Sequence, residues 1–275
     1  CIHQRIPHMT ENQQSTQRLP IALQIYTLRN VQQSPADVLA AVADAGYAGV
    51  ELAGTFAPGM AAADVRKLMD DAGLQVVSNH VSIDALEADL PGVVRAQQTL
   101  GNSMIIVPWI APAQRGETAD AWKALGTRLA GLARRVRTAG MDFMYHNHDF
   151  EMVMIDGRPA IDWLMEGAAE AGEPIGFEID VAWAQHGGQD VCSLLERYSG
   201  HVRRIHIKDL AVDPAAKPEE KGLADVGTGK LDWDAILPAA KQAGVEWYIV
   251  EHDHPSDPLA SIRTSYQFLA GKLAE

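Results

Sequence analysis

The chain has 275 residues, of which 47% are hydrophobic and 21% are charged, and its formal net charge at pH 7 is −13. This composition is typical of a globular protein, and the length suits one α/β barrel or two smaller domains. The acidic balance and the absence of a Lys/Arg cluster argue against a nucleic-acid or anionic-membrane surface and favour a small polar ligand.

The two cysteines, Cys1 and Cys192, permit at most one disulfide, which favours a reducing, cytoplasmic compartment. No apolar run approaches the roughly 18 residues of a membrane span, and the N-terminus lacks the apolar centre of a signal peptide. Residues 1–19 are polar and without periodicity, so we predict a disordered tail. Residues 1–8 precede Met9 and have the character of a cloning remnant; a mature lipoprotein beginning at Cys1 is the alternative.

From Pro20 onward, strand-like apolar runs alternate with helix-like segments. Ser34 begins a capping box with Pro35 at the first helical position, and apolar residues recur three and four apart over 121–139 and 258–273. Glycines that suit a left-handed helix end stand before strand-like runs at 46, 73, 101, 140, 172, 200 and 244. The eight predicted strands are 21–26, 48–52, 74–80, 103–107, 141–146, 175–180, 202–208 and 246–251.

This alternation of strand and helix indicates parallel strands joined by right-handed crossovers. We therefore predict an α/β protein whose single catalytic domain, residues 20–275, is a closed (β/α)8 TIM barrel. An open doubly wound sheet is the alternative, but no Gly-x-Gly-x-x-Gly follows the first strand.

Polar side chains stand at the C-terminal ends of the predicted strands, where barrels of this kind carry their active sites. In the run at 141–146, alternation places Met144, His146 and His148 on one face. In the last three strands the residues of opposite parity are apolar, which leaves the polar set for the barrel mouth. The polar residues at the strand ends are Glu51, His80, His146, His148, Glu178, Asp180, His206, Lys208 and Glu251.

Histidines and carboxylates that converge from adjacent strands predict a divalent-metal site, and Mn²⁺, Co²⁺, Zn²⁺ and Mg²⁺ all suit these ligand types. Each residue alone has a plainer interpretation as a hydrogen-bonded side chain or a helix cap. The metal is favoured because four adjacent strands share the pattern. Lys208 either serves in catalysis or substrate binding or simply pairs with Asp209 or Asp180.

Three other features have alternative interpretations. Trp109 is either a core residue or an aromatic wall for a sugar ring, and His252 and His254 are interpreted as peripheral. The run at 227–230 (Gly-Thr-Gly-Lys) lacks the spacing of a phosphate-binding P-loop. We expect the long loop around it to form a flexible lid or a rim.

Motifs at 23–29, 45–51, 145–148, 178–180, 206–209, 226–229 and 248–251 together resemble the xylose isomerase-like TIM-barrel superfamily. Within it, the chain is most similar to proteins known as sugar phosphate isomerase/epimerase, and the resemblance spans nearly the whole chain from Leu19. It implies a divalent metal held by strands five to eight. Asp180, His206 and Glu251 match the family's ligand positions.

The chain departs from the family pattern at two positions. Many members have a glutamate on strand five where this chain has His146, so the resemblance leaves the fourth ligand as His146, His148 or Glu151. Epimerases often carry a histidine at the position of Trp183. The Tyr-His-x-His run is more similar to the inosose dehydratase and 3-keto-glycoside lyase branches. The predicted substrate contacts are Gln24, Tyr26, Trp109 and Trp183.

The resemblance implies proton abstraction next to the carbonyl of a sugar or polyol, through an enediolate stabilised by the metal. Glu51, His148 or Glu251 would be the base, and Lys208 or His80 would hold the oxyanion. We predict an isomerase or epimerase first, and a dehydratase or lyase acting on a keto-sugar, keto-glycoside or inosose second. An apurinic endonuclease and a non-catalytic sugar-binding barrel are weaker alternatives. The oligomeric state, including a homo-oligomer, is left open.

Overall fold

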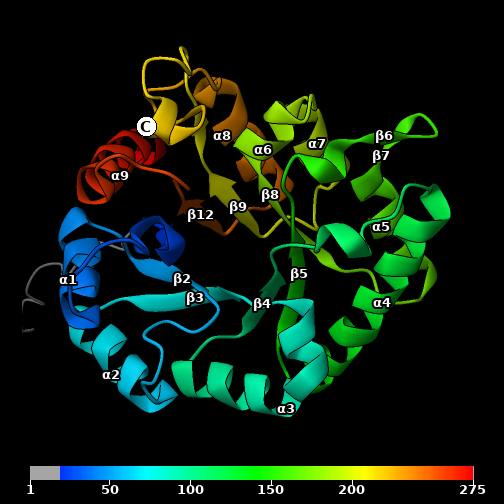
Figure 1. The fold of residues 1–275 in the computed structure, drawn as a ribbon, viewed down its shortest axis with the longest axis horizontal. Helices are drawn as coiled ribbons and strands as arrows, with labels where there is room; N and C mark the ends of the chain where they lie inside the picture. The colour runs from blue at the N-terminus through cyan, green and yellow to red at the C-terminus, as the bar shows by residue number, and fades with distance from the viewer. Residues whose placement is uncertain (1–18, 275) are drawn as a thin grey trace, which may run out of the picture.

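The computed structural model describes residues 19–274, and within them eight parallel strands close into a barrel surrounded by helices (Figure 1). The ring order is β1-β2-β3-β4-β5-β8-β9-β12, and β12 pairs back onto β1. This confirms the predicted (β/α)8 barrel; the predicted tail, apart from Leu19, lies outside the described residues. The strands of the ring are β1 (Ile21–Gln24), β2 (Gly49–Ala53), β3 (Gln75–His80), β4 (Met104–Val107), β5 (Asp142–His146), β8 (Gly176–Asp180), β9 (Arg204–Ile207) and β12 (Trp247–Val250).

Helices cover the outside of the ring (Figure 1). Ser34 caps the first helix as predicted, because its Oγ accepts a hydrogen bond from the backbone N–H of Asp37 at 3.2 Å. The α-helices are α1 (Pro35–Ala45), α2 (Ala62–Ala72), α3 (Ile83–Leu100), α4 (Ala119–Thr138), α5 (Ala160–Glu170), α6 (Val181–His186), α7 (Val191–Arg197), α8 (Trp233–Ala243) and α9 (Pro258–Ala274). Short 3₁₀ turns are η1 (Ile25–Leu28), η2 (Pro112–Gln114), η3 (Phe150–Met152) and η4 (Pro218–Glu220). None of the helices in residues 19–274 is long and apolar enough to cross a membrane.

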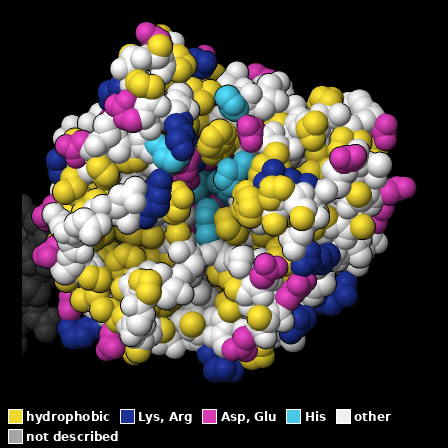
Figure 2. Space-filling view, in the orientation of Figure 1, with side chains coloured by type: hydrophobic (Ala, Val, Ile, Leu, Met, Phe, Trp, Pro, Cys, Tyr) yellow, Lys and Arg dark blue, Asp and Glu magenta, His cyan; other side chains and the backbone are white. Residues whose placement is uncertain are grey.

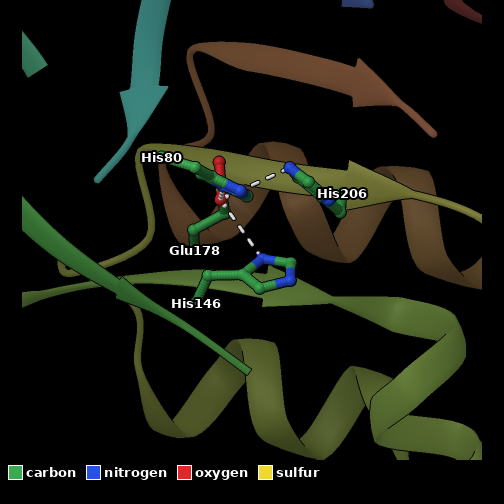
Figure 3. A group of neighbouring side chains, drawn as sticks. All are labelled: His80, His146, Glu178 and His206. Carbon is green, nitrogen blue, oxygen red and sulfur yellow. Dashed lines mark hydrogen bonds and ion pairs between the residues drawn. The ribbon is translucent and has the colours of Figure 1, made fainter. Parts of the chain in front are cut away.

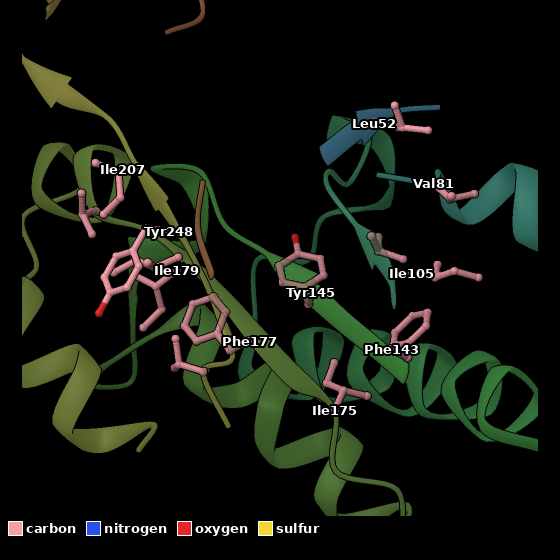
Figure 4. Close-up of a cluster of buried hydrophobic side chains, with 14 of the residues drawn as sticks. Leu52, Val81, Ile105, Phe143, Tyr145, Ile175, Phe177, Ile179, Ile207 and Tyr248 are labelled. Carbon is pink, nitrogen blue, oxygen red and sulfur yellow. The ribbon is translucent and has the colours of Figure 1, made fainter. Parts of the chain in front are cut away.

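The main hydrophobic core lies between the ring and the helices (Figure 4). Phe143 and Tyr145 of β5 and Phe177 and Ile179 of β8 point outward into it, as their parity predicts. The alternate residues of the same strands point into the barrel. Because of this division, the helix-facing residues stabilise the fold while the inward-facing residues are free to carry chemistry.

The interior of the barrel near its N-terminal end is mostly apolar, and the one charged side chain described there is Arg204 of β9, which donates to the Val77 carbonyl at 3.1 Å. Two small clusters of fully or almost fully buried side chains fill it, separate from the main core. Their members are Ala22, Val77 and Ile249 in one cluster and Met104, Ile106 and Met144 in the other. The barrel is therefore a packed core at this end and not a pore.

A β-bulge between β2 and β3 changes which residues of β3 face inward. Val50 pairs with Val76, but the next residue, Glu51, pairs with Ser78, so one residue of β3 is skipped. Val77 and Ser78 consequently both contact the interior, and the Ser78 hydroxyl donates to Glu51 Oε2 at 2.5 Å.

Two small antiparallel sheets stand on loops after strands of the ring. One pairs β6 (Met154–Ile155) with β7 (Arg158–Pro159), and the other pairs β10 (Asp209–Leu210) with β11 (Leu223–Ala224). The second sheet lies in the loop that we expected to be a lid or a rim. Paired backbone at its base makes that loop a rim.

Asp209 anchors this rim from a fully buried position. Its carboxylate accepts backbone hydrogen bonds from Gly227, Gly229 and Leu231 at 3.0–3.2 Å, and one from Trp233 Nε1 at 2.9 Å. A Cβ on Gly229 would lie 2.2 Å from Asp209 Oδ1, so only glycine fits there. The glycine-rich run thus wraps a carboxylate of its own chain, which accounts for it without a bound phosphate.

Candidate metal and proton-transfer site

The polar strand-end side chains meet in the mouth of the barrel. Figure 3 shows His80, His146 and His206, which come from three strands, turned toward Glu178 on a fourth. Asp180 ends β8, which is a neighbour of β9 in the ring. Most of the set is buried: Glu51, His146, Glu178, Asp180, His206, Lys208 and Glu251.

Two overlapping groups among the described residues place donor atoms close enough for a metal ion. One group is His80, His146, Glu178 and His206; the other is Asp180, His206 and Glu251. Within each group the ligand atoms lie within 4.8 Å of one another. The second group contains the three residues matched to the family's ligands, and the first adds Glu178, to which the sequence analysis assigned no role.

His206 links the two groups through its two ring nitrogens. Its Nε2 lies 2.6 Å from Glu51 Oε1, and its Nδ1 lies 3.0 Å from Glu251 Oε2 and 3.9 Å from Asp180 Oδ2. A carboxylate on the far nitrogen fixes the tautomer and orientation of a metal-binding histidine. Glu51 is placed to do this, with the Nδ1 side of the ring facing Asp180 and Glu251.

Without a bound cation, His206 is drawn to the charged form. Burial lowers its pKa, but Glu178, Glu51 and Glu251 outweigh burial and hold the pKa well above its ordinary value. Burial likewise raises the pKa of Glu51, and His80 and His206 reverse this, so its pKa lies well below the ordinary value. The carboxylates of this centre thus favour positive charge at its middle.

Glu51 and Gln24 lie beneath the cavity. Both are fully buried, and neither contributes to the cavity lining. Gln24 Nε2 donates to Glu51 Oε1 at 2.8 Å, and His80 Nε2 lies 3.0 Å from the same oxygen. With Ser78 on the other oxygen, Glu51 has no free acceptor facing a substrate. Glu51 as a base and Gln24 as a substrate contact stay predictions; in this structure both side chains hold other side chains in place.

Lys208 pairs with three carboxylates. Its Nζ lies 2.9 Å from Asp180 Oδ2, 2.9 Å from Glu251 Oε2 and 2.8 Å from Asp253 Oδ2. Burial lowers its pKa, and these carboxylates raise it well above the ordinary value, so the ammonium is retained. Of the two ion pairs considered from sequence, the pair between Lys208 and Asp180 forms. The Asp209 carboxylate instead accepts hydrogen bonds from the rim.

A cavity of about 690 Å³ opens above these groups. In Figure 2 the histidines are visible at the bottom of the central opening, with hydrophobic side chains around it. Three predicted substrate contacts, Tyr26, Trp109 and Trp183, line it. The cavity size is in the range of small-molecule sites.

Two histidines on this cavity have pKa values shifted in opposite directions. Burial lowers the pKa of His80, but Glu51 and Glu178 outweigh this and raise it to about 9. Burial and the neighbouring Lys208 lower the pKa of His148 to about 3. These shifts favour a protonated His80 and a neutral His148, and groups whose pKa values are pushed apart in this way suit acid and base roles.

Glu151, one of the three options for the fourth ligand, is turned away from the cation groups. It is fully buried, its Oε1 accepts from the Tyr145 hydroxyl, and its Oε2 accepts from the His148 backbone N–H at 2.8 Å. Burial raises its pKa to about 8, against the lowering effect of these hydrogen bonds. Both oxygens are engaged, so Glu151 orders the turn that carries His148.

The side chains fit a divalent cation. They offer carboxylate and imidazole donors, the ligand types of Zn²⁺, Co²⁺ and Mn²⁺ sites. Glu178 Oε1 is buried without a hydrogen-bond partner, and His146 Nδ1 lies 3.2 Å from the other oxygen of that carboxylate (Figure 3). Burial and the neighbouring His206 and His80 hold the pKa of His146 well below its ordinary value, which leaves the imidazole neutral, as a ligand must be.

Three contributors were missed by the strand-end argument. Asp253 lines the cavity and binds Lys208, His254 lines the cavity although we interpreted it as peripheral, and Ser78 holds Glu51. The parity of Asp253, two residues after Glu251, is a signal that could have identified it. Ser78 could not be identified in this way, because it faces inward only through the bulge.

Comparisons with known proteins agree with this architecture. A model of the xylose isomerase-like TIM barrel family matches residues 39–272. The rhizopine catabolism protein MocC of Rhizobium meliloti is 28% identical over 268 residues, covering 84% of this chain and 79% of MocC. An inosose dehydratase of Lacticaseibacillus casei is 29% identical over 167 residues, so the match covers 56% of this chain and only about half (54%) of that enzyme. The IolI protein, solved with a bound zinc atom, shares the fold with a TM-score of 0.74 at 14% identity, over 93% of this chain and 98% of IolI.

Proposed function

Because the chain belongs to the xylose isomerase-like TIM barrel family, we propose that it removes a proton next to the carbonyl of a keto-polyol or keto-sugar and then eliminates the neighbouring oxygen. It is an enzyme of a superfamily that includes isomerases, epimerases and dehydratases. The observation that carries the proposal is that two histidines, His80 and His148, line one cavity and both lie beside His146, with ring centroids 5.0 and 5.2 Å from it. Elimination needs both a base for the carbon-bound proton and an acid for the departing oxygen.

Asp180, His206 and Glu251 would hold a divalent cation, while His146, the fourth donor predicted from the sequence, is grouped with His80, Glu178 and His206. This set is preferred because Glu51 turns the Nδ1 side of His206 toward the two carboxylates. A bound cation would supply Lewis-acid polarisation of the substrate's carbonyl oxygen. The zinc of the IolI structure supports this class of cofactor, while Mn²⁺, Co²⁺ and Mg²⁺ stay open for this chain.

His148 takes the proton in this mechanism, because it lines the cavity and burial keeps its imidazole neutral. To protonate the oxygen that leaves, His80 turns its Nε2 away from Glu178 Oε2 and Glu51 Oε1, which lie 2.8 and 3.0 Å from it. Lys208 contacts Glu251 and Asp253, which line the cavity, so it maintains the geometry of those carboxylates and favours negative charge on the substrate above them. Trp183 provides a flat apolar wall for the ring.

Epimerisation or isomerisation, which the sequence analysis puts first, is the second candidate. It uses the same proton abstraction and differs in where the proton returns. The arrangement of the histidines supports this second candidate, because the rings of His80 and His148 both lie beside the His146 ring. The centroid distances are 5.0 and 5.2 Å. The similarity to inosose dehydratase in sequence supports elimination as the first candidate.

The test is exchange with solvent in D₂O, followed by NMR, after chelator treatment and re-addition of each of the four metals. Inososes, ketoses and 3-keto-glycosides form the substrate panel. We expect deuterium at the carbon next to the carbonyl and an α,β-unsaturated ketone as product. His148→Gln should abolish exchange, whereas His201→Gln, an exposed histidine outside the cavity lining, should not. No exchange with any substrate and any metal would refute the proposal.

The remaining predictions concern the substrate class, the cellular compartment and the oligomeric state. The substrate is a small sugar or polyol, and the net charge of −13 weighs against an apurinic endonuclease. We place the enzyme in the cytoplasm, where a free thiol such as that of Cys192 persists. A homo-oligomer is a prediction that gel filtration with light scattering would test.

A further inference from the structure

The cavity has two unlike ends. His146, His148 and Glu251 lie at one end, above β5 and β12. The other end lies over β2, β3 and β4. Its apolar lining residues are Ala53, Val81, Ala85, Val93, Ala96, Pro108 and Trp109, and the polar residues Thr55, Asn79, Ser82 and Gln97 lie among them. A sugar ring or polyol bound at the histidine end leaves this apolar end unfilled, and neither the metal nor the acid–base pair requires it.

A break in α3 shapes the apolar end. Asp89 has a non-helical backbone (φ −152°, ψ 68°) just before Pro91, so the helix consists of two segments that meet at a kink. Asp89 Oδ1 accepts from the Gly92 backbone N–H at 2.9 Å, and a Cβ on Gly92 would lie 2.0 Å from Asp89 Oδ2. The kink is therefore encoded in this short run.

Both segments of the kinked helix contribute to the lining. Ala85 comes from the segment before the kink, and Val93 and Ala96 come from the segment after it. These side chains are small or β-branched, and all three are at least partly accessible, so the surface they form is apolar and open to a ligand.

Two exposed aromatic residues flank this end. Tyr26 follows β1 and is 42% exposed, while Trp109 follows β4 and is 46% exposed. The strands between them in the ring are β2 and β3. The Arg29 guanidinium lies 3.9 Å from the centre of the Tyr26 ring and supports one face of it. Exposed aromatic rings beside an apolar cavity are suited to stacking on a flat or apolar group.

We propose that the cavity takes a two-part substrate. A keto-sugar or keto-polyol ring lies at the histidine end, and an apolar, ring-bearing substituent joined through an ether oxygen lies between Tyr26 and Trp109. This inference rests on the proposed function and specifies its leaving group as an alcohol or phenol. A substituent of this kind would bury the apolar surface that a free sugar leaves in water.

The elimination balances without any co-reactant. His148 takes the proton from the carbon next to the carbonyl, and the electrons of that C–H bond form the carbon–carbon double bond. The bond from the next carbon to the ether oxygen breaks, and its electron pair stays on that oxygen. His80 protonates the oxygen, so the products are an α,β-unsaturated ketone and a free alcohol or phenol.

The test measures binding without chemistry, using phenyl and methyl β-D-glucopyranoside, which lack the ketone. Calorimetry on the full chain should show the phenyl compound binding about 10-fold more tightly, equivalent to about 1.4 kcal/mol. Trp109→Ala and Val93→Phe, the second of which fills the apolar end, should each remove most of this ratio. Val153→Ala, an exposed apolar residue outside the cavity lining, should leave the ratio unchanged.

Equal binding of the two glycosides, no binding of either, or an equal loss for both in the Trp109 and Val93 variants would overturn the two-part substrate. The proposed function fails by a different measurement, the absence of solvent deuterium in every carbonyl substrate. Exchange with a free inosose combined with equal glycoside binding would therefore keep the function and reject this inference.

Discussion

Two layers of side chains inside the barrel differ sharply although the same strands carry both. On three strands the inward residue near the N-terminal end is apolar, and the inward residue two positions further along is polar or ionisable. The pairs on β1, β5 and β12 are Ala22 and Gln24, Met144 and His146, and Ile249 and Glu251. Parity decides that both members of a pair face inward, and position along the barrel axis decides their chemistry.

The two layers also contribute differently to stability. Burial of the apolar layer is favourable at about 25 cal/mol per Å² of apolar surface. In the ionisable layer, desolvation opposes the attraction between charges, and removing one partner of a buried pair costs about 3–5 kcal/mol. We conclude that the upper layer is retained for its chemistry, and that the lower layer and the outer core stabilise it.

The largest expected effect is in the upper layer. Asp180→Asn keeps the oxygen that accepts from the Trp183 backbone N–H, so the start of α6 is preserved. It removes a charge that faces Lys208 and His206. We expect loss of stoichiometric metal and at least a ~10³-fold fall in kcat/KM, since a ligand charge is lost from the cation site. Metal content by mass spectrometry and exchange kinetics measure both.

A matched control for that variant is Asp162→Asn. Asp162 is also buried, but it pairs with Arg197 and Tyr198 away from the barrel mouth. It should lose stability and keep its metal. If Asp180→Asn retains stoichiometric metal, the group built on Glu178 holds the cation instead.

The next effect is in the lower layer. Ile249→Ala opens a cavity among Ala22 and Val77, and we expect a loss of about 2–5 kcal/mol in the free energy of unfolding. Metal affinity and turnover of the folded variant should stay close to those of the parent protein. Urea denaturation followed by circular dichroism measures the first quantity. A fall in turnover without a fall in stability would show that the two layers are not separable.

The smallest effect concerns pH. The folded-state pKa of Glu151 is about 8, above its ordinary value of 4.5, so the folded protein holds this proton more tightly than the unfolded chain. The resulting stability is fully present below about pH 4.5 and is lost as pH rises through 8. Glu151→Gln removes this loss, and the cost of two weakened hydrogen bonds is the same at both pH values, so we expect the variant to gain about 4 kcal/mol on the parent protein between pH 5 and pH 9.

The free energy of unfolding at the two pH values, from urea titrations, measures that difference. Glu117→Gln, an exposed control, should show no such gain. A gain of equal size in both variants would mean that Glu151 is ionised in the folded protein.

Sequence periodicity was enough to predict the ring of strands and the outward packing of Phe177 and Ile179. It was also enough to predict that Asp180, His206 and Glu251 lie close together. These depend on local pattern and on the rule that parallel strands end at one face. The hydrogen-bond partners of these residues depend instead on the conformation that each side chain adopts in the barrel mouth. The sequence therefore could not show that Glu51 holds His206 from below the cavity.

The two small sheets on the loops could not be predicted for a related reason. Strands of two residues, such as β6 and β10, are too short to carry a period. The partners of Asp209 are backbone N–H groups up to 22 residues away, and sequence pattern does not encode such contacts.

The bulge in β3 has a consequence for any insertion or deletion in that strand. Glu51 pairs with Ser78 and Ala53 with His80, so the alternation of inward and outward side chains in β3 shifts by one residue just before Ser78. The polar end of the strand follows the shifted alternation. Deleting one residue ahead of Ser78 would restore an unbroken ladder and still deliver His80 to its place, whereas deleting one after it would rotate the imidazole into the helix layer. The orientation of the proton donor His80 thus depends on the number of residues that follow Ser78. The first half of β3 can therefore lose one residue without turning His80 out of the barrel.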